Sequence, residues 1–339
     1  MPKVIGHFSG FASPHVRLNG NNKAVSFDTK DLLRSAVRVG KKNNLDLMKH
    51  RFHAKMEMRY KIAIILANTR QNATGFLVRS GVYEFLDPSE KSNTSYYIGL
   101  SLAHMFAERL LKIPWLMHLD VYQNQHNVVA AVDTRSRPDL FGFNSRGKWY
   151  IIEAKGRSNE MEKGLIQKAK DQTDKVISIN GDNPVRIASV AHFIDNKVNV
   201  NWIDPDEFSA DAVSYIVNID QFFEQYYLLI VSAIGGIFDD HVPESNGNYY
   251  IAILDDTGLS VGLHKDIYDA YKNREFSSIP AISERLQYNL DETKSYGEDG
   301  TVLLIGDIGD QLSLPLTTVI PLEIDGEIEE RQDNRRKKT

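Results

Sequence analysis

The chain of 339 residues contains no cysteine. Disulfide bonds, zinc–thiolate sites and thiol catalysis are therefore excluded, and a reducing cytoplasm is the expected compartment. The longest apolar run, residues 226–238, has 13 residues, where a membrane span needs about 20. We expect a buried core helix in this run, with residues 226–234 as an alternative dimer interface, and no membrane partner. No GxxxxGK[ST] loop is present either, which argues against a nucleotide-driven motor.

Positive charge is missing from residues 198–264, which hold no Lys or Arg and 11 Asp or Glu. By contrast, residues 1–94 hold 16 Lys or Arg against 7 Asp or Glu, and residues 135–175 hold 10 against 6. A polyanion such as DNA would be attracted to the two basic regions and repelled by the acidic one. The acidic region would then face a second subunit or a partner protein. The alternative is that each charged block is simply a solvated face of the molecule.

The apolar periodicity predicts an α/β fold with a mixed central sheet flanked by helices. The expected order from residue 95 is a helix that stops at Pro114, three strands, a helix and two strands. The predicted ranges are a helix at 95–113, a strand at 115–123, an extended segment at 127–134, a hairpin of 139–144 with 148–156, a helix at 159–180 capped by Asn159 and Glu162, and strands at 185–194 and 198–203.

We divide the chain into four regions from these patterns. Residues 1–94 are a basic, helical region with one helix from Thr29, a second from about Leu45, and a strand pair or loop that ends in a turn at Asp87-Pro88. The remaining regions are a core at 95–204, an acidic α+β region at 205–330 that begins with a helix, and a polar basic tail at 331–339.

Three charged residues fall on the predicted hairpin. Side chains alternate along a strand, so Glu153 and Lys155 project from the same face. If the hairpin turns around residues 144–148, Asp139 comes to lie opposite Glu153. Two adjacent carboxylates repel each other unless a divalent cation takes up their charge. The alternative is an ordinary surface ion pair between Glu153 and Lys155 beside a strand-ending Asp139.

Oxygen ligands suit Mg²⁺, or Mn²⁺ as a substitute, and Mg²⁺ commonly takes only one or two protein carboxylates. We therefore expect a metal bound by Asp139, Glu153 and the backbone carbonyl of Ala154. Such a site serves phosphodiester hydrolysis well, because the metal neutralises developing charge and lowers the pKa of the attacking water. Lys155 would orient or deprotonate that water.

The sequence Pro138-Asp139, thirteen further residues, then Glu153-Ala154-Lys155 resembles the PD-(D/E)xK motif of restriction endonuclease-like nucleases. The order of elements around it is similar to the core of that superfamily. The resemblance implies that Asp139 and Glu153 bind the metal and that Lys155 is the catalytic lysine. It also suggests Glu108, on the preceding helix, as a metal ligand and Gln167, on the following helix, as a site residue. Glu108 and Gln167 can equally belong to solvated helix faces.

Several basic residues near the motif are candidates for contacts with nucleic acid, although lone arginines are commonly only solvated. They are Arg135, Arg137, Arg157, Lys163 and Lys170. We also note His118 and Asp120, which are expected on one strand face without a third ligand.

These observations predict a Mg²⁺-dependent nuclease. We favour a DNA endonuclease of a restriction, phage-defence or DNA-processing system, and a homodimer would allow it to cut both strands. Two alternatives remain open. One is an RNA nuclease, because the metal chemistry acts on the same phosphodiester, and the other is an inactive protein of the same fold that binds nucleic acid or acts as an assembly subunit.

Overall fold

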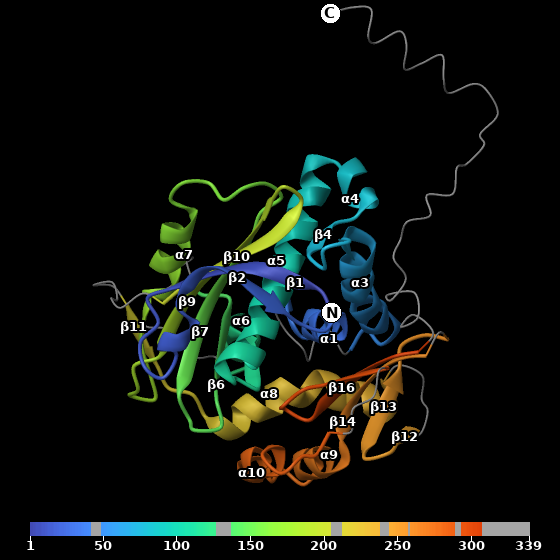
Figure 1. Ribbon diagram of the computed structural model, residues 1–339. Helices are drawn as coiled ribbons and strands as arrows, with labels where there is room; N and C mark the ends of the chain where they lie inside the picture. Colours follow the sequence, from blue (N-terminus) through green and yellow to red (C-terminus); the bar gives the residue numbers. More distant parts are fainter. Residues whose placement is uncertain are drawn as a thin grey trace, which may run out of the picture.

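A mixed sheet of nine strands forms the centre of the computed structural model, which describes residues 1–41, 49–126, 137–204, 212–237, 244–256, 258–288 and 293–306 (Figure 1). Seven strands follow the order β2-β1-β10-β9-β7-β6-β5, and β4 joins β10 beside β3. The pairs β1–β10 and β7–β9 are parallel, and the other pairs are antiparallel. The strands are β1 (Lys3–Ser9), β2 (Gly20–Ser26), β3 (Thr69–Gln71), β4 (Leu77–Arg79), β5 (Trp115–His118), β6 (Leu140–Phe143), β7 (Trp149–Gly156), β9 (Val185–Ile194) and β10 (Lys197–Ile203).

Two smaller sheets complete the strands in the described part of the chain. One is the parallel pair β8 (Val176–Ile179) and β11 (Val213–Tyr215). The other is antiparallel, with the order β12-β13-β14-β16-β15. Its strands are β12 (Glu244–Asn246), β13 (Tyr249–Ile253), β14 (Leu259–His264), β15 (Lys294–Tyr296) and β16 (Thr301–Ile305).

Helices cover both faces of the central sheet. The α-helices of the described residues are α1 (Thr29–Arg38), α3 (Phe52–Asn68), α4 (Gly81–Phe85), α5 (Pro88–Leu111), α6 (Leu119–His126), α7 (Leu165–Thr173), α8 (Ile219–Ser232), α9 (Lys265–Lys272) and α10 (Ile279–Ser283), of which α9 and α10 lie by the C-terminal sheet. Leu165 and Ala169 of α7 pack on Ala188 and Val190 of β9. On the opposite side α5 lies between the sheet and α3 (Figure 1). The central sheet is therefore a layer between helices, as the sequence predicted.

The long helix α5 has clear start and stop signals. The Asp87 side chain accepts hydrogen bonds from the backbone N–H groups of Ser89 (2.7 Å) and Glu90 (3.2 Å), and Pro88 occupies the first turn, where its missing N–H costs nothing. The helix ends where Lys112 adopts a left-handed conformation, two residues before Pro114. Asp87-Pro88, which we expected to form a turn, is thus the start of this helix, with Asp87 as its cap. The helix begins at residue 88 and not at residue 95.

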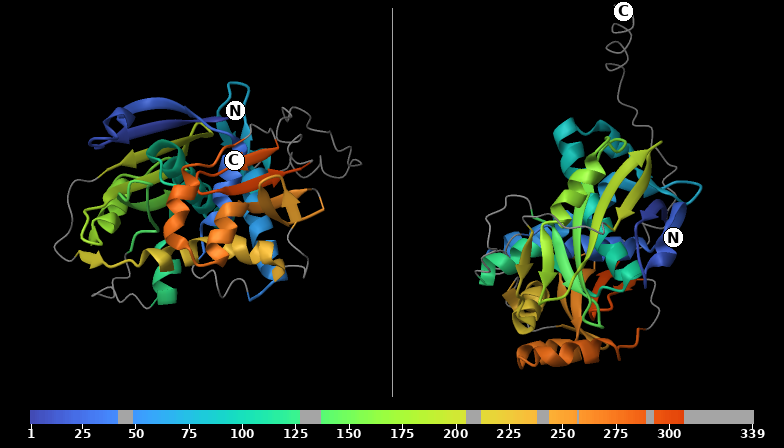
Figure 2. Two further views of the ribbon diagram at one scale, coloured as in Figure 1. Left: turned by 90° about the horizontal axis from the view of Figure 1, so that it is seen from below. Right: turned by 90° about the vertical axis from the view of Figure 1, so that its left-hand side faces the viewer.

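The C-terminal sheet packs on α1 and α8, and it shares one hydrophobic core with the central sheet (Figures 1 and 2). The helix α8 begins where the Asn218 side chain accepts a hydrogen bond from the Gln221 N–H (3.0 Å). Its apolar residues are buried inside this chain, as the core-helix prediction required; they include Tyr226, Tyr227, Leu229, Ile230 and Val231. This burial removes the 226–234 stretch as a dimer interface. No helix among the described residues is long and apolar enough to cross a membrane.

Some expected elements are different in the structure. The N-terminal region, which we expected to be helical, begins with β1 and β2, and β1 is an internal strand of the central sheet. Residues 1–94 and 95–204 therefore contribute to the same sheet, and residue 95 lies inside α5. Only residues 115–118 of the segment 115–123 are a strand, because the chain turns into α6 at Leu119. The expected segment 127–134 and the tail 331–339 lie outside the described residues.

The helix that we expected at 159–180 is shorter and has a different start. Gly164 has a φ of 79°, a left-handed conformation that favours glycine, and α7 begins only after it. Asn159 does not cap the helix; its carbonyl accepts a hydrogen bond from the Phe193 N–H instead. The C-terminal part of the predicted helix forms strand β8. Part of the strand pair expected at 74–88 is the short helix α4, and the expected start of α3 near Leu45 lies outside the described residues.

A buried histidine gives the fold a defined acid sensitivity. His104 of α5 is 1% exposed, its Nε2 lies 3.2 Å from the carbonyl oxygen of Leu116, and its Nδ1 lies 3.1 Å from the Ser35 hydroxyl. Because a carbonyl only accepts, Nε2 carries the proton and Nδ1 accepts from Ser35. Burial, together with Arg38 and Arg34, lowers the pKa of His104 from 6.5 to about 3.

Between pH 6.5 and about 3, we expect His104 to be protonated in the unfolded chain and neutral in the folded chain. The stability that neutral His104 contributes is complete above pH 6.5, and it falls by about 1.4 kcal/mol per pH unit as the pH drops through that window. His104→Gln keeps a donor for Leu116 but does not titrate. Urea unfolding of both proteins at several pH values between 4 and 7 would show this slope in the difference between them. A constant difference would contradict the assignment.

Candidate active site

The hairpin β6–β7 has the register that the sequence analysis required. Leu140 pairs with Ile152, which brings Asp139 opposite Glu153. The Asp139 N–H donates to Glu153 Oε2 (3.1 Å), and the Ala154 N–H donates to Asp139 Oδ2 (3.0 Å). The turn is closed by Asn144, whose N–H donates to the Lys148 carbonyl (3.1 Å). The two carboxylates are therefore held side by side by backbone hydrogen bonds at one end of the hairpin.

Lys155 completes this group. Its Nζ donates to Glu153 Oε1, so the charges of the two side chains are paired. The β7–β9 register places Glu153 beside Ala188 and Lys155 beside Val190, on the sheet face that α7 covers. The Lys155 side chain is 26% exposed and that of Glu153 is 1% exposed. A substrate can thus reach the lysine and Asp139 more easily than Glu153.

Two glycines allow α5 to approach this strand end closely. A Cβ added at Gly156 would lie 1.8 Å from the carbonyl oxygen of Ser95, and one added at Gly99 would lie 2.9 Å from the Lys155 carbonyl. Such distances are below van der Waals contact, so neither position has room for a side chain. The close approach fixes the second turn of α5, with Tyr96, next to the residue that follows Lys155.

The carboxylates carry an electrostatic cost. Burial, followed by repulsion from Asp139, raises the pKa of Glu153 to about 8, although Lys155 offsets part of the rise. Burial also raises the pKa of Asp139, against the effects of the Ala154 N–H, His118 and Lys155. A positive charge at this point would favour the ionised forms of both groups. This is the electrostatic condition under which a cation binds.

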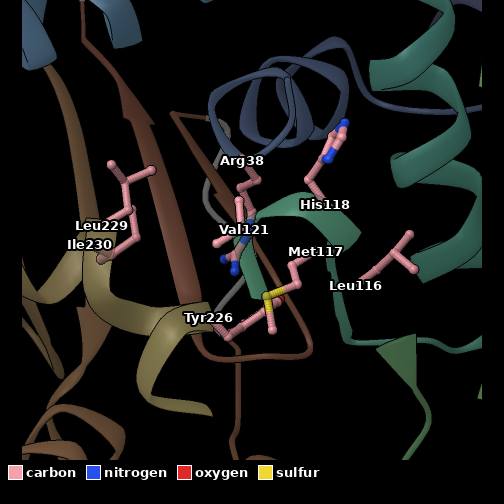
Figure 3. A pocket seen from close by; sticks show the side chains of 8 residues that line it. All are labelled: Arg38, Leu116, Met117, His118, Val121, Tyr226, Leu229 and Ile230. Atoms are coloured by element: carbon pink, nitrogen blue, oxygen red, sulfur yellow. The ribbon is translucent and has the colours of Figure 1, made fainter. Parts of the chain in front are cut away.

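His118, at the end of β5, is the neighbour that the sequence did not place. Its Nε2 lies 3.9 Å from Asp139 Oδ1, and its buried Nδ1 has no hydrogen-bond partner among the described residues. Burial lowers the pKa of His118, while Asp139 and Asp120 oppose the shift. His118 is also one of the residues around a cavity of about 20 Å³ between α1, β5, α6 and α8 (Figure 3). That volume suits one water molecule and not a nucleotide, so the cavity is not a substrate site.

Asp120 and Arg137 form a pair next to His118. Asp120 lies on α6 and not on a strand with His118, and its Oδ1 is 3.5 Å from Arg137 Nη2. Gln172 of α7 donates to the Arg137 carbonyl (3.4 Å). Gln172 is therefore the α7 glutamine that contacts the segment before Asp139. By contrast, Gln167 is exposed and donates to Asp171 on its own helix (2.9 Å).

Glu108 lies in a different group of charges. It is 4% exposed, its Oε2 is 2.5 Å from Arg34 Nη2, and its Oε1 accepts a hydrogen bond from the Glu298 N–H (3.1 Å). The α5 side chain that is affected electrostatically by Asp139 and Glu153 is Tyr96. Burial, and then those carboxylates, raise the pKa of Tyr96 to about 12. The structure thus does not bring Glu108 to the carboxylate pair.

The basic residues that we expected to contact nucleic acid differ in their exposure to solvent. Arg135 lies outside the described residues. Arg157 is half-buried, and its Nε is buried without a hydrogen-bond partner among the described residues, whereas Lys163 is exposed and Lys170 is half-buried. In the basic N-terminal region Arg34, Lys41 and Lys61 are buried, so this part of the positive charge does not face solvent.

The donors at the hairpin end are suited to a hard divalent cation. Asp139 and Glu153 supply carboxylate oxygens, and the Ala154 carbonyl is the third ligand that we expected. Among the described residues, no group of three or more His, Asp or Glu side chains is arranged to hold a metal ion unaided. Water and a substrate phosphate would have to complete the coordination of Mg²⁺ here.

No protein-family model, curated protein or solved structure matches the chain. The chemistry of the site therefore has to be inferred from its own geometry.

We expect Glu153 to make stability depend on pH when no metal is present. Its folded pKa of about 8 lies above its ordinary value of 4.5, so the folded chain keeps a proton that the unfolded chain has lost. This contribution is complete below pH 4.5 and is lost as the pH rises through 8, at about 1.4 kcal/mol per unit. Urea unfolding with EDTA should show the slope as a difference between wild type and Glu153→Gln. Mn²⁺ should stabilise only the wild type, and equal stabilisation of both would contradict the site.

A second variant tests whether Glu108 is a ligand of the expected metal. Glu108→Gln weakens the buried pair with Arg34, and we expect a loss of about 2 kcal/mol in the free energy of unfolding. Calorimetric titration with Mn²⁺ should give the wild-type affinity for this variant, whereas Asp139→Asn should bind much more weakly. Loss of Mn²⁺ affinity in folded Glu108→Gln would restore Glu108 as a ligand.

Proposed function

We propose that this protein is a divalent-metal-dependent nuclease of the restriction endonuclease-like type, which hydrolyses phosphodiester bonds in DNA. One observation carries the proposal: backbone hydrogen bonds hold the carboxylates of Asp139 and Glu153 side by side at the end of a hairpin, and the Lys155 ammonium contacts the Glu153 carboxylate. The mixed sheet between helices is a suitable frame for such a site. A DNA-processing, restriction or phage-defence role in the cytoplasm accords with the proposed chemistry.

Asp139, Glu153 and the Ala154 carbonyl would hold Mg²⁺ or Mn²⁺. The bound cation would neutralise charge on the scissile phosphate and lower the pKa of the attacking water. Glu153 would then be ionised and bound to the cation, so the Lys155 ammonium could donate to a phosphate oxygen or orient the water. His118, whose Nε2 lies 3.9 Å from Asp139 Oδ1, would be a polar neighbour of that carboxylate.

The acidic region 198–264 remains a proposed contact for a partner protein or a second copy of the chain. Part of its charge is already neutralised internally, because Asp255 lies 3.7 Å from Arg59 and Glu224 lies 3.5 Å from Arg274.

The proposal is tested by incubating the protein with plasmid, single-stranded DNA and RNA, each with Mg²⁺ or with EDTA. We expect cleavage of DNA only with Mg²⁺, and a loss of at least about 100-fold in Asp139→Asn and Lys155→Met, since each removes charge stabilisation of the transition state. Asp171→Asn and Lys148→Met change the same residue types at exposed positions and should cleave like the wild type.

Three results would decide against the proposal or redirect it. Equal cleavage by wild type and Asp139→Asn would indicate a contaminating nuclease and would show that the active site is wrongly assigned. Cleavage of RNA alone would make the protein an RNA nuclease. Binding without cleavage of any substrate would favour an inactive protein that binds nucleic acid. Circular dichroism of each variant would establish that it is folded.

A further inference from the structure

Three tyrosine rings contact one another between the surface of α3 and the candidate site. Tyr60 of α3 is 47% exposed, and its ring centroid lies 6.1 Å from that of Tyr97 on α5, with the planes at 89°. Tyr97 in turn lies 5.4 Å from Tyr96, with the planes at 63°. These distances and angles are typical of edge-to-face aromatic packing, which fixes the orientation of each ring. We call Tyr60, Tyr97 and Tyr96 the tyrosine series.

The inner end of the tyrosine series is next to the carboxylate pair. The backbone nitrogen of Tyr96 lies 2.8 Å from the position of a Cβ added at Gly156, the residue after Lys155. The carboxylates of Asp139 and Glu153 also raise the pKa of Tyr96, after burial, which indicates that its hydroxyl lies in their field. The series therefore runs from an exposed helix face to the part of α5 that packs against Gly156, at the strand end that carries the proposed site.

Basic residues outnumber acidic ones in the chain around the outer end. Residues 49–68 contain five Lys or Arg and one acidic residue, Glu57. Arg59, whose side chain is 42% exposed, precedes Tyr60 in the chain. On the buried side, the Lys61 ammonium lies 3.7 Å from the ring centroid of Tyr97, a cation–π contact. An aromatic surface with basic residues around it complements a polyanion that also has flat apolar groups.

We propose that the tyrosine series binds the bases of a single-stranded DNA segment and leads it to Asp139, Glu153 and Lys155. Unpaired bases offer faces that stack on tyrosine rings, while Lys49, Arg51 and Lys55, around the start of α3, would lie along the phosphates. In a duplex those faces are already occupied by neighbouring base pairs. Because Tyr60 is held by Tyr97, little conformational entropy is lost when a base stacks on it. The role in substrate delivery rests on the proposed nuclease function, whereas the binding itself can be measured without cleavage.

The test uses the full chain, EDTA and a fluorescently labelled oligothymidine, with binding followed by fluorescence anisotropy. We expect Tyr60→Ala to raise the Kd about tenfold, because it removes one stacking platform. Tyr60→Phe, which keeps the ring, should bind like the wild type. The matched control is Tyr288→Ala, since Tyr288 is 37% exposed and packs on Tyr296 in the C-terminal sheet. We expect the Kd of this variant to be unchanged.

A Kd for Tyr60→Ala equal to that of the wild type would overturn the inference, and so would tighter binding of a duplex of the same length. Tighter binding of oligouridine would replace DNA by RNA as the bound strand. Asp139→Asn, which lacks a proposed metal ligand, should bind oligothymidine like the wild type in EDTA. If no substrate is cut but binding depends on the ring of Tyr60, the tyrosine series stands and the nuclease function fails. If DNA is cut but Tyr60→Ala changes neither binding nor cleavage of single strands, the nuclease function stands and the role of the tyrosine series is wrong.

Discussion

A buried cluster of four charges holds the two large sheets in one arrangement. Arg34 lies 2.5 Å from Glu108, and Arg38 lies 2.5 Å from Asp299, with all four side chains 6% exposed or less. Arg38 also packs over the ring of Tyr226 at 4.2 Å. Buried charges are costly unless each has a partner, so α1, α5, α8 and the turn before β16 can move apart only by separating these pairs. Arg38 and Arg34 outweigh the effect of burial and keep the pKa of Asp299 below its ordinary value. The candidate site depends on this arrangement, because α5 is also the helix that packs against β7.

The parts of the fold that could be predicted were those specified by neighbouring residues. Strands β6 and β7 are joined by a short turn at Asn144–Lys148, and β9 and β10 are long apolar segments on either side of a tight turn. By contrast, β2 consists mostly of polar residues, and β1 pairs with a strand that is very distant in the sequence. The segment 119–126 is too short for its pattern to separate a helix from a strand.

The same distinction applies to the site. Asp139, Glu153 and Lys155 were predictable because one hairpin carries all three, and its register follows from the turn. Tyr96 and His118 come from α5 and β5, whose contacts with the hairpin depend on tertiary packing. A helical pattern gives the face on which a residue lies but not which part of the helix reaches a neighbour. This limit explains why Glu108 was matched to the site from sequence, although its contacts are with the charge cluster.

The position of β1 has a consequence for how the protein forms during synthesis. Ile5 pairs with Asn199, so β1 is an internal strand whose partner β10 is synthesised much later than β1. Until then the hydrogen-bonding edge of β1 toward β10 is exposed, and closing such a long loop is slow. A fragment limited to residues 95–204 would lack this strand and expose the edge of β10. Protection of β1 by a chaperone until β10 is available would therefore favour correct assembly of the sheet.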